Sequence, residues 1–80
     1  MYYVYVLKSQ KDSNYYIGQT NNLDSRLKRH NAGYIKSTKN RRPLKLIFHK
    51  SINSRSEAMK YERYLKSGAG REFLDNILDP

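Results

Sequence analysis

The chain has 80 residues and no cysteine, which excludes a disulfide framework, a thiolate zinc site and a cysteine nucleophile. Its composition does not change along the chain, so we expect one domain, residues 1–80, near the lower size limit for a single hydrophobic core. Sixteen Lys and Arg against seven Asp and Glu give a net charge of +9, which favours a polyanionic partner such as nucleic acid.

Residues 2–7 are aromatic or aliphatic at both alternating sets of positions, which predicts a strand buried on both faces at the centre of a sheet. This run is too short for the core of a signal peptide or for a membrane span, so we expect the protein in the cytoplasm. A turn cluster at residues 12–14 separates it from a second strand-like run, residues 15–18. The two runs predict an antiparallel hairpin.

A helix is predicted over residues 23–32, because Asn22 is a suitable N-cap and Gly33 can stop the helix. Residues 34–43 are polar and basic, which indicates an exposed loop before a third strand at residues 44–48. The loop is a candidate contact for phosphate. A solvated connection with no partner is an equally good interpretation of the same residues.

Residues 54–57 have the Ser-x-x-Glu pattern of a capping box, which predicts a helix that runs to about Lys66, with Gly68 as its left-handed stop. A short last helix is predicted near residues 71–78. The order strand, strand, helix, strand, helix, helix predicts an α+β fold, in which a small three-stranded, mainly antiparallel sheet packs against helices.

Arg26 and His30 fall on the same side of the first predicted helix as Leu23 and Leu27, because side chains advance about 100° per residue. A surface arginine normally points away from a sheet, so this pair suggests a lined cleft. The alternative is that Arg26 runs its stem along the edge of the helix and that His30 is a hydrogen-bonded core histidine.

Glu62 borders the buried face of the second predicted helix, about 40° around the axis from Ala58, whereas Glu57 belongs to the capping box. A carboxylate beside an apolar stripe needs a cation, since burying it unpaired costs several kcal/mol. The cation is either a metal ion or Lys66, one turn later, in a weak intrahelical pair.

Tyr5 and Tyr16 lie on the two strands of the predicted hairpin, and Gly18 shares a face with Tyr16. A glycine inside a strand is costly unless backbone or a ligand comes close to it. The two tyrosines therefore either meet beside the glycine in a site or form ordinary cross-strand aromatic packing.

Five elements stand in a register that resembles the GIY-YIG nuclease superfamily. They are Tyr3-Val4-Tyr5, ten intervening residues before Tyr16-Ile17-Gly18, Arg26, His30 four residues later, and Glu62 in the pattern Ala58-x-x-x-Glu62-x-x-Leu65-Lys66. The resemblance runs from Tyr2 to about Leu78. It is greatest to the small stand-alone members, which are related to the N-terminal nuclease domain of the bacterial excision-repair incision subunit.

The chain departs from the family pattern at three positions. Tyr3 stands where the family name has glycine, and Gln19 stands where the excision-repair branch has lysine. His30 replaces a tyrosine of that branch and resembles some restriction-enzyme members. A lysine-assisted step is therefore not expected here.

The resemblance implies hydrolysis of one phosphodiester strand of DNA, in repair or processing, with a single divalent ion, Mg²⁺ or Mn²⁺ in its place. It implies that Glu62 holds the metal, that Arg26 binds the scissile phosphate, and that Tyr5, Tyr16 and His30 position and deprotonate the attacking water. Tyr5 with support from His30 is the expected base, which requires cations to lower a tyrosine pKa of about 10.

Six further residues are expected to contact nucleic acid: Gln19, Arg29, Lys36, Lys39, Arg41 and Arg42. The main alternative function is a non-catalytic nucleic-acid-binding module on the same fold, and a protein-interaction module with an acidic partner is a third. Since a pure binder has no use for an acid that faces phosphate, Glu62 favours the enzyme.

Overall fold

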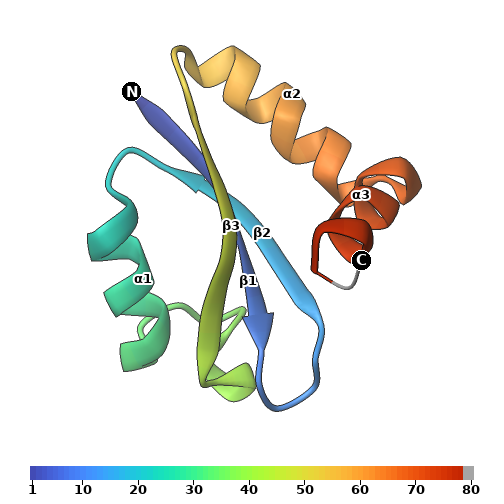
Figure 1. Ribbon diagram of the computed structural model, residues 1–80. Helices are drawn as coiled ribbons and strands as arrows, with labels where there is room; N and C mark the ends of the chain where they lie inside the picture. Colours follow the sequence, from blue (N-terminus) through green and yellow to red (C-terminus); the bar gives the residue numbers. More distant parts are fainter. Residues whose placement is uncertain (79–80) are drawn as a thin grey trace.

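The computed structural model describes residues 1–78, in which a three-stranded sheet carries helices on both faces (Figure 1). The strands are β1 (Tyr2–Ser9), β2 (Tyr15–Thr20) and β3 (Leu44–Ile52), in the order β2-β1-β3 with both pairings antiparallel. The helices are α1 (Leu23–Ala32), α2 (Arg55–Lys66) and α3 (Gly68–Leu78), with a short 3-10 helix η1 (Lys39–Arg41) before β3. None of the helices in this part of the chain is long and apolar enough to cross a membrane. The predicted α+β fold and order of elements are confirmed.

β1 is the middle strand, and its alternating side chains belong to the hydrophobic cores on both faces of the sheet. Val4 and Val6 pack with α2 and α3, whereas Tyr5 and Leu7 pack with α1, and all four are at most 1% exposed. Burying an aliphatic side chain of this size contributes roughly 1.5–3 kcal/mol. β1 therefore joins the two helical layers, as its continuous apolar sequence predicts.

β3 extends four residues beyond its predicted end at residue 48, to Ile52. It pairs with β1 along the whole of that strand, from Leu44 beside Ser9 to Ile52 beside Tyr2. Its last residues are largely exposed at the edge of the sheet, so polar side chains are tolerated there. The apolar pattern therefore ends before the strand does.

The predicted bounds of α1 are confirmed by its two caps. The Asn22 side chain accepts a hydrogen bond from the Ser25 amide at 3.1 Å. Gly33 has a left-handed φ of 86° and its amide donates to the His30 carbonyl. These caps fix the rotation of α1, and with it the direction of the side chains at positions 26 and 30.

The predicted end of α2 at Lys66 is confirmed, but the predicted way in which the helix stops is wrong. Ser54 caps the start of α2 through the Glu57 amide as expected, but Gly68 is not a left-handed stop. Ser67 ends α2 with extended backbone, and its side-chain oxygen accepts from the Gly70 amide at 3.2 Å. Because Ser67 also caps the next helix, α3 begins at Gly68, before the predicted residue 71.

Candidate active site

A pocket of about 430 Å³ lies over the outer edge of β2. Its polar lining includes Tyr5 of β1, Tyr15, Tyr16 and Gln19 of β2, Arg26 of α1, and Glu62 and Lys66 of α2. α1 covers one face of the sheet and α2 covers the other (Figure 1), so the arginine and the glutamate reach the pocket from opposite sides. The edge strand is thus the place where the two helical layers present polar groups to one another.

Gly18 leaves room for two tyrosine rings. It pairs with Tyr5 in the β1–β2 register, and a Cβ atom on Gly18 would lie 2.8 Å from the Tyr5 hydroxyl oxygen and 3.2 Å from Cε2 of Tyr16. The centroids of the two tyrosine rings are 6.3 Å apart, and the His30 ring lies 5.7 Å from Tyr5 and 5.0 Å from Tyr16. The tyrosines therefore meet beside the glycine, at the wall of the pocket.

His30 is completely buried behind Tyr5. Its Nε2 atom lies 2.9 Å from the Tyr5 hydroxyl oxygen, and its Nδ1 atom lies 2.8 Å from the Thr38 hydroxyl oxygen. Burial, and then the positive charge of Arg26, lower the pKa of His30 from 6.5 to about 4. His30 is therefore a neutral, hydrogen-bonded core histidine, as the alternative interpretation of the sequence has it, whereas Arg26 lines the pocket.

Tyr5 is a neutral phenol at physiological pH. Burial raises the pKa of its hydroxyl to about 12, and the adjacent Tyr16 adds to that shift. The Arg26 guanidinium opposes the shift through its charge and through a hydrogen bond to the hydroxyl. Arg26 therefore lowers the pKa of Tyr5 as expected, but burial raises it by more. Tyr5 alone is thus a poor general base at neutral pH.

Glu62 forms an ion pair with Lys66, at 2.7 Å between Oε2 and Nζ. The Glu62 side chain is 20% exposed and the Lys66 side chain 54% exposed, so solvent screens the pair and it contributes about 1 kcal/mol or less. The same carboxylate lines the pocket with Arg26 and Tyr5. Glu62 therefore both pairs with Lys66 and lines the pocket.

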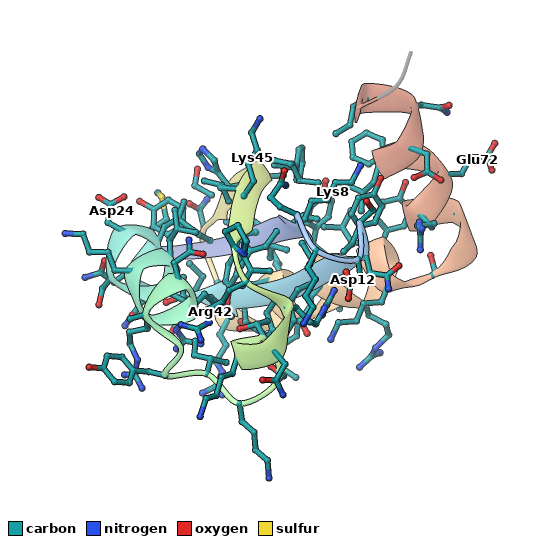
Figure 2. The ribbon with its side chains drawn as sticks, turned by 90° about the horizontal axis from the view of Figure 1, so that it is seen from below. Lys8, Asp12, Asp24, Arg42, Lys45 and Glu72 are labelled. Carbon is teal, nitrogen blue, oxygen red and sulfur yellow. The ribbon has the colours of Figure 1, made fainter. Side chains whose placement is uncertain are left out.

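The pocket contains one carboxylate that could bind a metal ion, that of Glu62. Residues 1–78 contain no group of three or more His, Cys, Asp or Glu side chains that could hold one, and the acids Asp24 on α1 and Glu72 on α3 lie at opposite ends of the molecule (Figure 2). Glu62 in an open pocket suits a hard ion such as Mg²⁺, which keeps several of its waters. It does not suit Zn²⁺, which takes three or four protein ligands.

The residues expected to contact nucleic acid do not form one surface, since one lines the pocket and others are exposed away from it. Gln19 lines the pocket beside Glu62. Arg29 is exposed on the outer side of α1, and Lys36 and Lys39 are exposed in the loop. These three cations are available to a ligand, although none of them lines the pocket at Glu62.

Arg41 and Arg42 have partners within the fold. Arg41 pairs with Asp12 at 3.3 Å and donates from Nη2 to a carbonyl of β2 at 3.3 Å. Arg42 donates from Nε to the Lys39 carbonyl at 2.8 Å. The Arg41 contacts tie residues 34–43 to the β1–β2 hairpin, whereas the Arg42 contact lies within the loop itself.

Sequence reasoning missed Thr38, the buried partner of His30, and considered Lys66 only as a partner of Glu62. Thr38 lies in a polar loop, where no periodic pattern marks a buried position. The helical spacing that predicts the Glu62–Lys66 pair would also have placed Lys66 at the pocket.

The chain is similar to several known proteins. The UPF0213 protein SH2523 of Staphylococcus haemolyticus is 40% identical to the chain over 77 residues, 95% of this chain and 93% of that protein. The UPF0213 protein CPE1444 of Clostridium perfringens is 45% identical over 67 residues, 82% of this chain and 71% of that protein. The solution NMR structure of the UPF0213 protein BH0048 from Bacillus halodurans is similar, with a TM-score of 0.59 and 34% identity over 96% of this chain and 85% of that one. A family model described as the GIY-YIG catalytic domain matches residues 1–73, so the chain belongs to the GIY-YIG family.

Proposed function

We propose that the protein is a divalent-metal-dependent endonuclease that hydrolyses a phosphodiester bond in DNA, in repair or processing. The observation that carries the proposal is the arrival of Glu62, Arg26 and Tyr5 in one pocket from three different elements. A carboxylate, a guanidinium and a hydroxyl are suited to a metal ion, a phosphate and an attacking water. Membership of the GIY-YIG family supports the same class of reaction.

Glu62 and Arg26 act on the phosphate from opposite sides. Glu62 would hold Mg²⁺, or Mn²⁺ in its place, and the bound ion would supply positive charge to the leaving oxygen. Glu62 must first release Lys66, which costs little because the pair is exposed. Arg26 binds the scissile phosphate through its fork of N–H donors, where negative charge grows in the transition state.

Tyr5 and His30 together take the proton of the attacking water. A pKa of about 12 makes free phenolate scarce, and His30 is buried away from the water. When Tyr5 accepts the proton of the water and passes its own to Nε2 of His30, at 2.9 Å, Tyr5 stays a neutral phenol and the positive charge forms on His30. Tyr16 packs against both rings and keeps them in position.

A non-catalytic DNA-binding module on the same fold is the second candidate. The ion pair between Glu62 and Lys66 favours it, because the carboxylate already has a cation and needs no metal. The net charge of +9 supports nucleic acid as the ligand in either case. Metal-dependent cleavage separates the two candidates.

Two glutamates of α2 provide a matched pair of variants. Glu62→Gln keeps the size of the side chain but removes the charge that a hard divalent ion requires, so we expect cleavage to be lost while fold and DNA binding persist. Glu57→Gln should cleave like the wild type, because Glu57 lies in the first turn of α2, where its amide donates to Ser54 and glutamine also serves.

The assay is a panel of labelled DNA and RNA molecules, single-stranded, duplex, flapped and branched, incubated with Mg²⁺, Mn²⁺ or EDTA. Affinities are measured in Ca²⁺, and circular dichroism checks the fold of each variant. Cleavage by Glu62→Gln at the wild-type rate would show that the metal assignment is wrong. Tight binding by the wild type without cleavage of any substrate would favour the second candidate.

A further inference from the structure

Thr38 is fully buried in a loop whose neighbouring residues are polar and exposed. Its hydroxyl oxygen lies 2.8 Å from Nδ1 of His30 and 3.4 Å from the carbonyl oxygen of Ile35. Its backbone carbonyl accepts from the Arg41 amide at 2.9 Å, at the start of η1. Arg41 is itself held to the β1–β2 hairpin, since the Ser9 hydroxyl donates to its carbonyl at 2.6 Å. Thr38 is therefore held against the Nδ1 atom of His30, whereas the Nε2 atom faces Tyr5.

The number of protons that Tyr5, His30 and Thr38 carry determines the direction of the hydrogen bonds between them. A neutral histidine carries one N–H, and the tyrosine and the threonine carry one O–H each. The Arg26 guanidinium beside the Tyr5 hydroxyl can only donate, so the acceptor that residues 1–78 provide for the Tyr5 proton is Nε2 of His30.

It follows that Nε2 is the unprotonated nitrogen and that Nδ1 carries the proton, which it donates to Thr38. The Thr38 hydroxyl then donates to the Ile35 carbonyl, and all three protons have an acceptor. The opposite tautomer would make Nε2 a donor to Tyr5 and leave the phenolic proton without a protein acceptor at this buried position.

We infer that Thr38 is a positioning residue that holds His30 in the tautomer with its proton on Nδ1, so that Nε2 can accept the proton of Tyr5. The inference deepens the proposed nuclease function and rests on it for its effect on the rate. The tautomer itself does not depend on the nuclease function, because it exists in the free protein. The groups that face His30 are Tyr5, Tyr16 and Arg26, together with Thr38 itself.

The proton balance of the step is complete. The O–H bond of water breaks as its oxygen attacks phosphorus, and the proton goes to the Tyr5 oxygen while the Tyr5 proton goes to Nε2. The bond from phosphorus to the leaving oxygen breaks, and that oxygen takes a proton from solvent. His30 is then an imidazolium, still donating from Nδ1 to Thr38, and it returns its extra proton through Tyr5 to water after the product leaves.

The direct test is ¹⁵N NMR of the histidine rings in the free protein at neutral pH. The chain has two histidines, and exposed His49 serves as an internal reference. The wild type should show the proton of His30 on Nδ1. Thr38→Val keeps the shape but loses the hydroxyl, so Nδ1–H loses its acceptor and the proton should shift to Nε2. Thr38→Ser keeps a hydroxyl and should restore the wild-type spectrum.

Single-turnover cleavage gives the second readout. Positioned proton transfer contributes about 10²–10⁴-fold to such reactions, so Thr38→Val should lose about tenfold or more in rate while Thr38→Ser cleaves near the wild-type rate. Affinity for DNA in Ca²⁺ should be the same in all three proteins, because Thr38 is buried.

Three results would overturn the inference: a wild-type proton on Nε2, a proton that stays on Nδ1 in Thr38→Val, or a change of tautomer with no change in cleavage rate. If Thr38→Val does not fold, the wild-type spectrum still decides, because a proton on Nε2 would overturn the inference. If the wild type cleaves nothing, the proposed function fails, whereas the spectra still establish or refute the tautomer.

Discussion

His30 should make the stability of the protein depend on pH well above the range in which carboxylates titrate. Burial lowers the pKa of His30 from 6.5 to about 4, so between these values the unfolded chain binds a proton that the folded chain refuses. Stability is therefore complete above pH 6.5 and is lost as the pH falls towards 4. From pH 7.5 to pH 5.0 this one group should remove about 2 kcal/mol from the free energy of unfolding.

The measurement is urea unfolding at several values between pH 7.5 and 5.0, for the wild type and for His30→Gln, whose side chain does not titrate. The wild type should lose about 2 kcal/mol more than the variant over this range. Asp12, whose pKa is lowered from 3.8 chiefly by a hydrogen bond from the Asn14 amide, titrates below the window and does not contribute. Parallel pH dependences in the two proteins, with equal slopes in urea, would refute the lowered pKa of His30.

Three further predictions concern the pocket wall and the loop. Gly18→Ala adds a methyl group only 2.8 Å from the Tyr5 hydroxyl oxygen, so the tyrosine ring must move. Cleavage should fall by about 100-fold, while the affinity for DNA measured in Ca²⁺ stays unchanged. Cleavage at the wild-type rate would show that the position of the Tyr5 ring does not matter. Replacing the exposed Lys36 and Lys39 by Gln should reduce the slope of log affinity against log salt by about 1.8, with no change in melting temperature. Arg41→Gln should instead destabilise the fold, by about 1 kcal/mol in urea unfolding, since its ion pair and its hydrogen bond to β2 are lost. An unchanged slope in the double lysine variant would exclude the loop from the DNA interface.

Local signals in the sequence predict those parts of the fold that depend on near neighbours. Asn22 and Gly33 determine the bounds of α1, and the spacing along that helix brings Arg26 and His30 to the same side. Gly68 shows where this reasoning stops. A glycine after a helix can be a left-handed cap or the first residue of the next helix, and the preceding serine, which caps α3, decides between the two.

The contact between Thr38 and His30 could not be predicted from local signals. It depends on the path of a loop whose other residues are polar, and that path is fixed by contacts with the β1–β2 hairpin. The protonation state of Tyr5 could not be predicted from the sequence either. The expected base needed a pKa lowered by cations, and only the structure shows that burial of Tyr5 outweighs the charge of Arg26.

The position of the pocket on the rim of the sheet limits how the protein can associate with other chains. β2 pairs only with β1 among the strands of residues 1–78, so its outer side has backbone groups to which another strand could add. Such an addition would cover the space between Arg26 and Glu62, which reach that rim from opposite faces. A partner that extends the sheet without blocking the pocket must therefore add to β3, the other edge strand.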